Sequence, residues 1–210
     1  SENHVTSIAH LKNGYSIIGT TDGLNLVKDY ELDRVWDNYD GVFKGNHISD
    51  LVSNEDAVLG LTINNELFYI KDSGNVYLDY FISNQLNKKF DSMHKKISNA
   101  SNSFWISTDS SICALKIDKN RIGISKELKI SNVVKIVGDE KVLFGFTKDK
   151  KLFKIEDDEV VWELQLKKTE EIKFVLNESK SSYWVCLKGQ IMHVKFLGDT
   201  YDLKHFSINE

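Results

Sequence analysis

The chain consists of short apolar runs separated by small polar clusters. Near its end, Ile172, Phe174 and Leu176 alternate with polar or smaller neighbours. Three further apolar runs follow, at residues 183–187, 191–196 and 201–208. A polar turn precedes each run, at residues 177–182, 188–189 and 198–200. Apolar residues at every second position are typical of a half-buried strand, and Gly, Asn, Asp and Ser favour tight turns. The pattern predicts four antiparallel strands joined by short turns.

This four-strand pattern recurs along the whole chain. Five segments align without gaps, with Leu or Ile at the first position and Val, Ile or Leu at the fourth. They are LNLVKD from Leu24, LFYIKD from Leu67, ICALKID from Ile112, LFKIED from Leu152 and IMHVKF from Ile191. Their mean spacing is about 42 residues, inside the ~40 to 50 residues of a propeller blade. The chain is therefore a repeat protein. Its hairpins are predicted at residues such as Asp22-Gly23 and Asn64-Asn65, which tolerate the positive φ that tight turns require.

A four-stranded meander cannot bury both of its faces, so copies of it must stack, and stacking around a common axis is the familiar solution at this period. We predict an all-β fold, a β-propeller of about five four-stranded antiparallel blades, in a single domain over residues 1–210. The blades are expected at approximately 1–38, 39–83, 84–129, 130–167 and 168–210. The pattern starts in a first strand and ends in a fourth. Either the five blades close into a ring, which we expect, or the chain is part of a larger propeller.

One stretch departs from the strand pattern. Leu86, Phe90, Met93 and Ile97 are spaced by four, three and four residues, which is the spacing of a helical stripe. A helical turn is therefore predicted before the first strand of the third blade.

Composition and charge narrow the classes of partner that this chain is expected to bind. The formal net charge is -4, and Lys and Arg are mixed with Asp and Glu rather than gathered in a stripe, so no nucleic acid partner is expected. No apolar run approaches the ~20 residues that cross a bilayer, and we expect no membrane span in this chain. The sequence starts with Ser1 and polar residues in place of a signal peptide or an initiating Met. It is either a processed protein or a piece of a longer one.

The two cysteines, Cys113 and Cys186, each lie in an apolar run without a second Cys nearby. We interpret both as small core residues rather than as a disulfide, so they leave the redox compartment open. The sequence contains no zinc-binding spacing, no phosphate-binding loop and no nucleophile elbow. We expect no cofactor, no metal site and no catalytic residue.

The candidate binding residues lie just before predicted first strands. His4 and His47 each follow an Asn, in NHVTSI and NHISDL. The first strand of a propeller blade is innermost, so these residues should ring the mouth of the central channel. The predicted ligand- or partner-binding residues are Asn3, His4, Asn46, His47 and His94. The alternative is that the Asn residues only form the turn and the histidines are solvated.

The four tryptophans have structural interpretations. Trp105 and Trp184 share one repeat position and are predicted to be core residues. Trp36 and Trp162 lie in outer strands and are expected to pack between blades.

The charged clusters also have plain interpretations. Lys148, Lys150, Lys151 and Lys154 precede the acidic turn 156–159 and are interpreted as a solvated face. Three carboxylates fall in or near corresponding turns, at Asp22, Asp109 and Asp149. Asp is a common turn former, but carboxylates around a channel would also suit a five-bladed glycoside hydrolase.

Two stretches resemble a known family. IIGTTDGL at 17–24 and YDGVFKGNHISDL at 39–51 resemble the two-component regulator propeller, a repeat of periplasmic sensor regions in bacterial hybrid signalling proteins; FWISTDSSI at 104–112 is a weaker match. The resemblance covers about half of the chain. It departs from the family in lacking Pro in the linker and in having fewer blades, and a divergent WD-repeat-like propeller would look similar.

The function we predict is a non-catalytic recognition module that binds a ligand or a protein partner at a propeller face. The resemblance implies the sensor region of a signalling protein, which would be periplasmic or extracellular. One alternative is an intracellular WD-repeat-like scaffold subunit, cytoplasmic or nuclear. The second alternative is a five-bladed glycoside hydrolase.

Overall fold

The computed structural model describes most of the chain. The described residues are 4–36, 47–54, 57–71, 76–78, 96–100, 103–108, 110–118, 121–138, 142–167, 172–179, 181–198 and 200–207. All regular elements among them are strands, and none is a helix that could cross a membrane. Of the predicted helical stripe, Leu86, Phe90 and Met93 lie outside this part of the chain, whereas Ile97 belongs to a strand.

The strands form five sheets in chain order. The first sheet contains β1 (Val5–His10), β2 (Tyr15–Thr20), β3 (Gly23–Lys28) and β4 (Glu31–Trp36); the second contains β5 (Ile48–Ser53), β6 (Ala57–Thr62), β7 (Leu67–Lys71) and β8 (Val76–Leu78). The third contains β9 (Lys96–Ala100), β10 (Ser103–Ser107), β11 (Ile112–Asp118) and β12 (Arg121–Leu128). The fourth contains β13 (Val133–Gly138), β14 (Leu143–Thr147), β15 (Lys151–Glu156) and β16 (Glu159–Gln165); the fifth contains β17 (Ile172–Ser179), β18 (Ser182–Leu187), β19 (Gln190–Leu197) and β20 (Thr200–Ser207).

Each sheet is an antiparallel meander, and the five share one register. The repeated segments form the third strand of each sheet, and the second strand always pairs with them in the same way. The equivalent pairs are Ile17–Leu26, Leu59–Tyr69, Trp105–Ala114, Phe144–Lys154 and Trp184–His193. The hairpins between these strands use positive φ at Gly23 and Asn65, as predicted. The gapless sequence alignment is therefore also a structural alignment.

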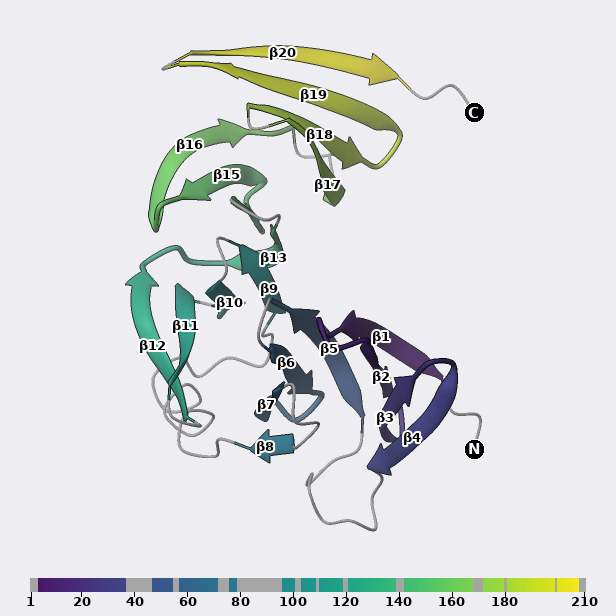
Figure 1. Ribbon diagram of the computed structural model, residues 1–210. Coiled ribbons are helices and arrows are strands. Elements are labelled where there is room, and N and C mark those ends of the chain that lie inside the picture. Colours follow the sequence, from purple (N-terminus) through teal and green to yellow (C-terminus); the bar gives the residue numbers. More distant parts are fainter. Residues whose placement is uncertain are drawn as a thin grey trace.

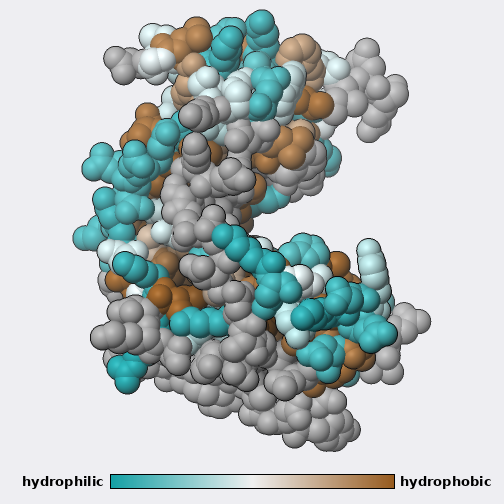
Figure 2. Space-filling model, in the orientation of Figure 1, coloured by the Kyte–Doolittle hydropathy of each residue, from teal (hydrophilic) through white to brown (hydrophobic). Residues whose placement is uncertain are grey.

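The sheets stack side by side in an arc, as the blades of a β-propeller do (Figure 1). Four apolar clusters join consecutive sheets, and each takes residues from both. The arc is open: the first and fifth sheets lie at its two ends, with the hollow of the molecule between them (Figures 1 and 2). The described residues of the five sheets do not close into the ring that we expect from the sequence.

Each sheet has a front face, turned toward the next sheet in the chain, and a back face, turned toward the preceding one. The first position of the repeated segment lies on the front face. In the first four sheets it is fully buried, with 0–1 % exposure at Leu24, Leu67, Ile112 and Leu152. Apolar residues at this position thus form the contact between blades.

The interpretation of Lys154 as part of a solvated face is wrong. Its side chain is only 5 % exposed, because it lies on the front face of the fourth sheet and the fifth sheet covers it. Lys151 keeps 37 % exposure and pairs with Glu163 at the surface. Trp162 packs against the fifth sheet, as predicted for a residue between blades, while the side chain of Trp36 lies outside the described part.

Candidate functional site

The structure places only two of the five predicted binding residues. Asn3, Asn46 and His94 lie outside the described part of the chain. His4 is exposed and His47 is half-buried, and each immediately precedes the first strand of its sheet. Their strands, β1 and β5, contact each other, so the two histidines belong to neighbouring blades.

Both histidines have the same backbone role. The carbonyl of His4 accepts a hydrogen bond from the Thr21 N–H at 3.0 Å, and that of His47 accepts one from the Ile63 N–H at 2.9 Å. Each bond ties the start of the first strand to the hairpin that follows the second strand. This backbone role accounts for the position of both residues, and ligand binding by their side chains stays a prediction.

The hairpin that contains Asp22 or Asp149 is built on a buried threonine. Thr20 accepts a hydrogen bond from the Asp22 N–H at 3.1 Å, and Thr147 accepts one from the Lys151 N–H at 3.0 Å. Hydrogen bonds from Thr147 and from the backbone hold the pKa of Asp149 below its usual value. The same Thr recurs at the end of the second strand in four sheets, at Thr20, Thr62, Thr108 and Thr147. Asp22 and Asp149 are thus parts of turns, and Asp109 lies outside the described residues.

Trp105 and Trp184 are equivalent in the repeat but differ in environment. Trp105 is 2 % exposed in the cluster between the third and fourth sheets, as predicted. Trp184 is half-buried on the front face of the fifth sheet, where no further described sheet covers it. The prediction that Trp184 is a core residue is therefore wrong. Cys113 is buried as predicted, whereas Cys186 on the same open face is only half-buried; neither cysteine forms a disulfide.

This open front face of the fifth sheet is the candidate site. The apolar part of this face includes Leu176 at 54 % exposure and Phe206 at 46 %. Trp184 lies between them: the Trp184 ring centroid is 5.7 Å from the Phe206 ring centroid, and Trp184 pairs with Leu176 across β17 and β18. Cys186 and Ile191, which pair across β18 and β19 on the same face, are half-buried. The fifth sheet carries apolar side chains among polar ones at the end of the arc (Figure 2). Contiguous exposed apolar patches are typical of interaction sites, which makes this face the candidate.

A polar cluster lies on the same face, next to the hairpin between β17 and β18. Ser182 donates a hydrogen bond to Glu178 Oε2 at 2.5 Å, and the Trp184 Nε1–H donates to Glu178 Oε1 at 3.2 Å. His193 Nε2 lies 2.9 Å from Glu178 Oε2 and 2.7 Å from Ser182 Oγ, and its ring stacks on Trp184 at 4.4 Å. Hydrogen bonds from Ser182 and then His193 lower the pKa of Glu178 to about 2. The carboxylate is therefore ionised at neutral pH, and half-exposed.

The Ser–His–Glu composition of this cluster does not amount to a nucleophile. A catalytic histidine uses one ring nitrogen to accept the serine proton and the other to contact the carboxylate. Here both contacts converge on His193 Nε2, and the ionised carboxylate can only accept, so Nε2 carries the proton. Ser182 also donates directly to Glu178 and is 4 % exposed. The geometry holds the face together rather than activating an oxygen.

This site was not predicted from the sequence, because the repeat position alone indicates burial. His193 occupies the third position of the repeated segment, where the other sheets have Leu26, Tyr69, Ala114 and Lys154. Polar residues at this position in the last two repeats were the available signal.

No family model matches this chain, and no curated protein matches it. Solved structures share its fold. The extracellular domain of the putative hybrid two-component system BT3049 of B. thetaiotaomicron is similar over 99 % of this chain and 28 % of that one, with a TM-score of 0.69 and 14 % identity. The corresponding domain of the putative one-component system BT4673 is similar over 95 % of this chain and 27 % of its own, with a TM-score of 0.65 and 11 % identity.

Similar structures also include proteins that bind other proteins or peptides. YCF48 bound to D1 peptide is similar over 97 % of this chain and 67 % of that one, with a TM-score of 0.65 and 10 % identity. This chain spans little more than a quarter of the two sensor domains. These likenesses show a β-propeller fold that occurs in sensor extracellular domains and in protein-binding modules.

Proposed function

We propose that this chain is a non-catalytic β-propeller recognition module that binds a protein partner through the front face of its fifth sheet. The observation that carries the proposal is the register. In four sheets the front-face residues equivalent to Trp184 are Ile17, Leu59, Trp105 and Phe144, all covered by the next sheet with 0–3 % exposure. The fifth sheet presents the same pattern without a covering sheet among the described residues.

The partner that fits this face is another antiparallel β-sheet with an apolar back face. The nearest internal precedent is the third sheet, whose front face also carries a Trp and an Ile, at Trp105 and Ile112. The fourth sheet covers them with Leu143, Phe153 and Ile155. The polar cluster does not disfavour such a contact, because Lys154, equivalent to His193, is covered by the fifth sheet while its ion-pair partner Glu156, 2.8 Å away, keeps 42 % exposure.

A second copy of this chain fits the face less well. The only other open face at an end of the arc is the back face of the first sheet. It carries Ser16 and Asn25 at the positions where the second sheet has Val58 and Phe68. His10 is hydrogen-bonded to Ser16 at 2.9 Å on this face. This face therefore has polar side chains at the two central positions that are apolar on the second sheet, although Ile8, Leu32 and Val35 farther out on it are exposed.

Within this proposal, the sensor region of a signalling protein is the version that the resemblance of residues 17–24 and 39–51 supports. The shared fold with two extracellular sensor domains agrees with it. An intracellular scaffold subunit is the alternative, supported by the shared fold with the peptide-bound YCF48. Binding by Asn3, His4, Asn46, His47 and His94 at the channel mouth would add a second contact surface to either version.

The experiment adds a sheet that can cover this face. A second copy of residues 130–167, the repeat that covers Trp105, is appended after Glu210, and the labelling rate of Cys186 by a maleimide is measured. We expect labelling to slow by about tenfold or more relative to the 210-residue chain, because the thiol then reacts only when the contact opens. Buried Cys113 is the internal control. In a matched extension, the appended Phe and Ile equivalent to Phe153 and Ile155 are replaced by Asp, and protection should be lost.

Unchanged labelling of Cys186 in the extended chain would overturn the proposal, as would equal protection by the Asp-containing extension. A 210-residue chain that is already dimeric in solution, with Cys186 protected until dilution, would identify a second copy as the occupant instead.

A further inference from the structure

A pocket of about 420 Å³ lies between the fourth and fifth sheets, on the side of the fifth sheet opposite to the proposed partner face. Strands β15 and β16 form one wall, and β19, β20 and the turn between them form the other. Glu156 and Tyr201 stand at its rim with 42 % exposure each, so solutes can reach it. Small-molecule sites commonly measure ~300–1,000 Å³, and this pocket is within that range.

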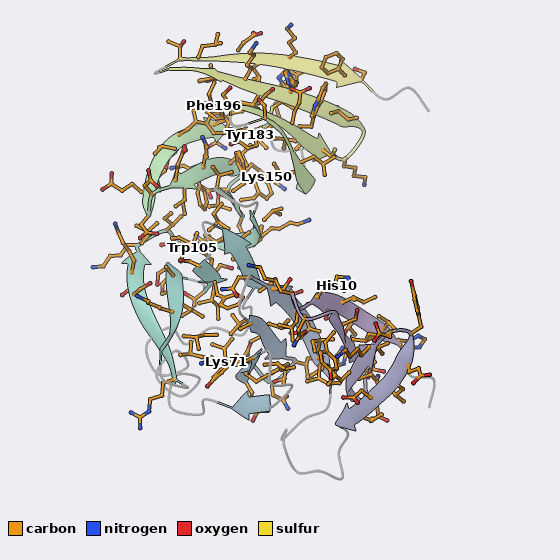
Figure 3. All side chains as sticks on the ribbon, in the orientation of Figure 1. His10, Lys71, Trp105, Lys150, Tyr183 and Phe196 are labelled. Atoms are coloured by element: carbon orange, nitrogen blue, oxygen red, sulfur yellow. The ribbon has the colours of Figure 1, made fainter. Side chains whose placement is uncertain are left out.

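The apolar part of the wall is aromatic and rigid. The Trp162 ring lies edge-on to Phe196, with centroids 5.4 Å apart at 88°, and edge-on to Tyr201, also at 5.4 Å and 81°. Phe196 in turn contacts Tyr183 at 5.9 Å, and both point from the fifth sheet toward the fourth (Figure 3). Interlocked rings hold one another in place, so they present a fixed surface for a flat apolar group.

The wall also contains an unsatisfied hydrogen-bond donor. The Nε1 atom of Trp162 is buried and has no partner among the residues that the structure describes. An indole N–H can only donate, and leaving a buried donor unpaired costs about 1–3 kcal/mol. A small rotation of the indole toward the pocket would let a ligand acceptor reach this atom and recover that cost.

A buried cation adjoins the donor. The Lys154 ammonium is 2.8 Å from Glu156 Oε2 and 4.3 Å from the centroid of the Phe196 ring. An ammonium has three N–H donors, and the hydrogen bond to Glu156 uses one of them. Lys154 and Trp162 pair across β15 and β16, so both donors belong to the same part of the wall.

We propose that this pocket binds a small planar carboxylate, an aromatic or heteroaromatic ring that carries an acidic group. The ring packs against Trp162, Phe196 and Tyr201. The carboxylate accepts hydrogen bonds from Trp162 Nε1 and Lys154 Nζ, and charge-assisted bonds of this kind are the stronger ones. The site is separate from the partner face, so either proposal can fail without the other.

The test is a titration of the ¹⁵N-labelled 210-residue chain with indole-3-acetate as the probe, followed by the side-chain N–H resonance of Trp162. Free indole, which lacks the carboxylate, is the matched probe. We expect the Trp162 resonance to shift with indole-3-acetate at low millimolar concentration or below. Trp162→Phe and Lys154→Met should each weaken binding by about tenfold, which corresponds to the loss of one hydrogen bond to a charged group. Because Trp162→Phe has no indole N–H, its affinity is measured from the backbone amide resonances of β19 and β20. Lys151→Met removes a lysine outside the pocket and should bind as the wild type does.

Glu156→Gln provides a variant that does not depend on a buried substitution. Removing the competing carboxylate should strengthen binding of indole-3-acetate several-fold. The proposal is overturned if the Trp162 resonance does not move, if indole and indole-3-acetate bind equally, or if Trp162→Phe leaves the affinity unchanged.

Discussion

Gly145 is the position where a single methyl group should disturb the packing most clearly. It pairs with Phe153 across β14 and β15. A Cβ at Gly145 would lie 1.9 Å from Cζ and 2.3 Å from Cε2 of the Phe153 ring, which is fully buried. The ring therefore fills the space that a side chain would need. Overpacking of a core costs about 1–3 kcal/mol, and we expect Gly145→Ala to lower the free energy of unfolding by about that amount.

The other sheets indicate how the damage could be repaired. Gly60 stands against Phe68 in the same way, with a Cβ-to-ring distance of 2.0 Å. In the third sheet the equivalent pair is Ile106 and Cys113, a larger residue facing a smaller one. Copying this pair into the fourth sheet, as Gly145→Ile with Phe153→Cys, should make the double variant about 0.5–3 kcal/mol more stable than the sum of the single changes predicts.

Urea unfolding followed by circular dichroism, with linear extrapolation to water, measures these free energies. Gly123→Ala is the matched control, because the nearest atom to its added Cβ is the Lys116 carbonyl oxygen at 3.8 Å, an ordinary contact. Its stability should be unchanged or raised by up to about 1 kcal/mol. A Gly145→Ala variant as stable as the wild type, or additive single changes in the pair, would refute the packing argument.

Three further predictions test other parts of the structure. The folded-state pKa of Glu178 is about 2 against an ordinary 4.5, so its contribution to stability is present above pH 4.5 and is lost as the pH falls toward 2. Over this pH window the Tm of Glu178→Gln should therefore fall less steeply than the Tm of the wild type. Parallel Tm curves for the two proteins would contradict the hydrogen-bonded cluster around Glu178. The Thr108 hydroxyl donates to the carbonyl of buried Ser111 and accepts from its N–H, so Thr108→Val should lower the free energy of unfolding by about 1–3 kcal/mol. The control is the exposed Thr200: Thr200→Val, measured by the same urea unfolding, should change the free energy of unfolding by less than about 0.5 kcal/mol. Lys154→Ala should cost about 2–4 kcal/mol in urea unfolding, because it removes a stem that is buried between the fourth and fifth sheets. A loss no larger than that of a surface lysine would argue against the burial of Lys154.

The sequence alone determined the repeat, its register and the identity of the strands. Alternation of apolar residues, turn residues such as Asp22-Gly23 and the gapless segments all depend on neighbours close in the chain, and antiparallel hairpins follow from such local information. Pairing of Ile17 with Leu26 and of Trp184 with His193 could therefore be read from the alignment. The central candidate residues His4 and His47 were also placed correctly at the starts of first strands.

Only the tertiary structure decided which of the equivalent positions are covered. Trp105 and Trp184 are alike in the repeat, yet one lies under the next sheet and the other is half-exposed at the end of an open arc. Lys154 has the composition of a surface residue and is buried between sheets. Burial depends on whether another sheet stacks on that face, which is a contact between residues far apart in the chain. No local pattern contains that information, and both candidate sites, the open face and the pocket between blades, result from it.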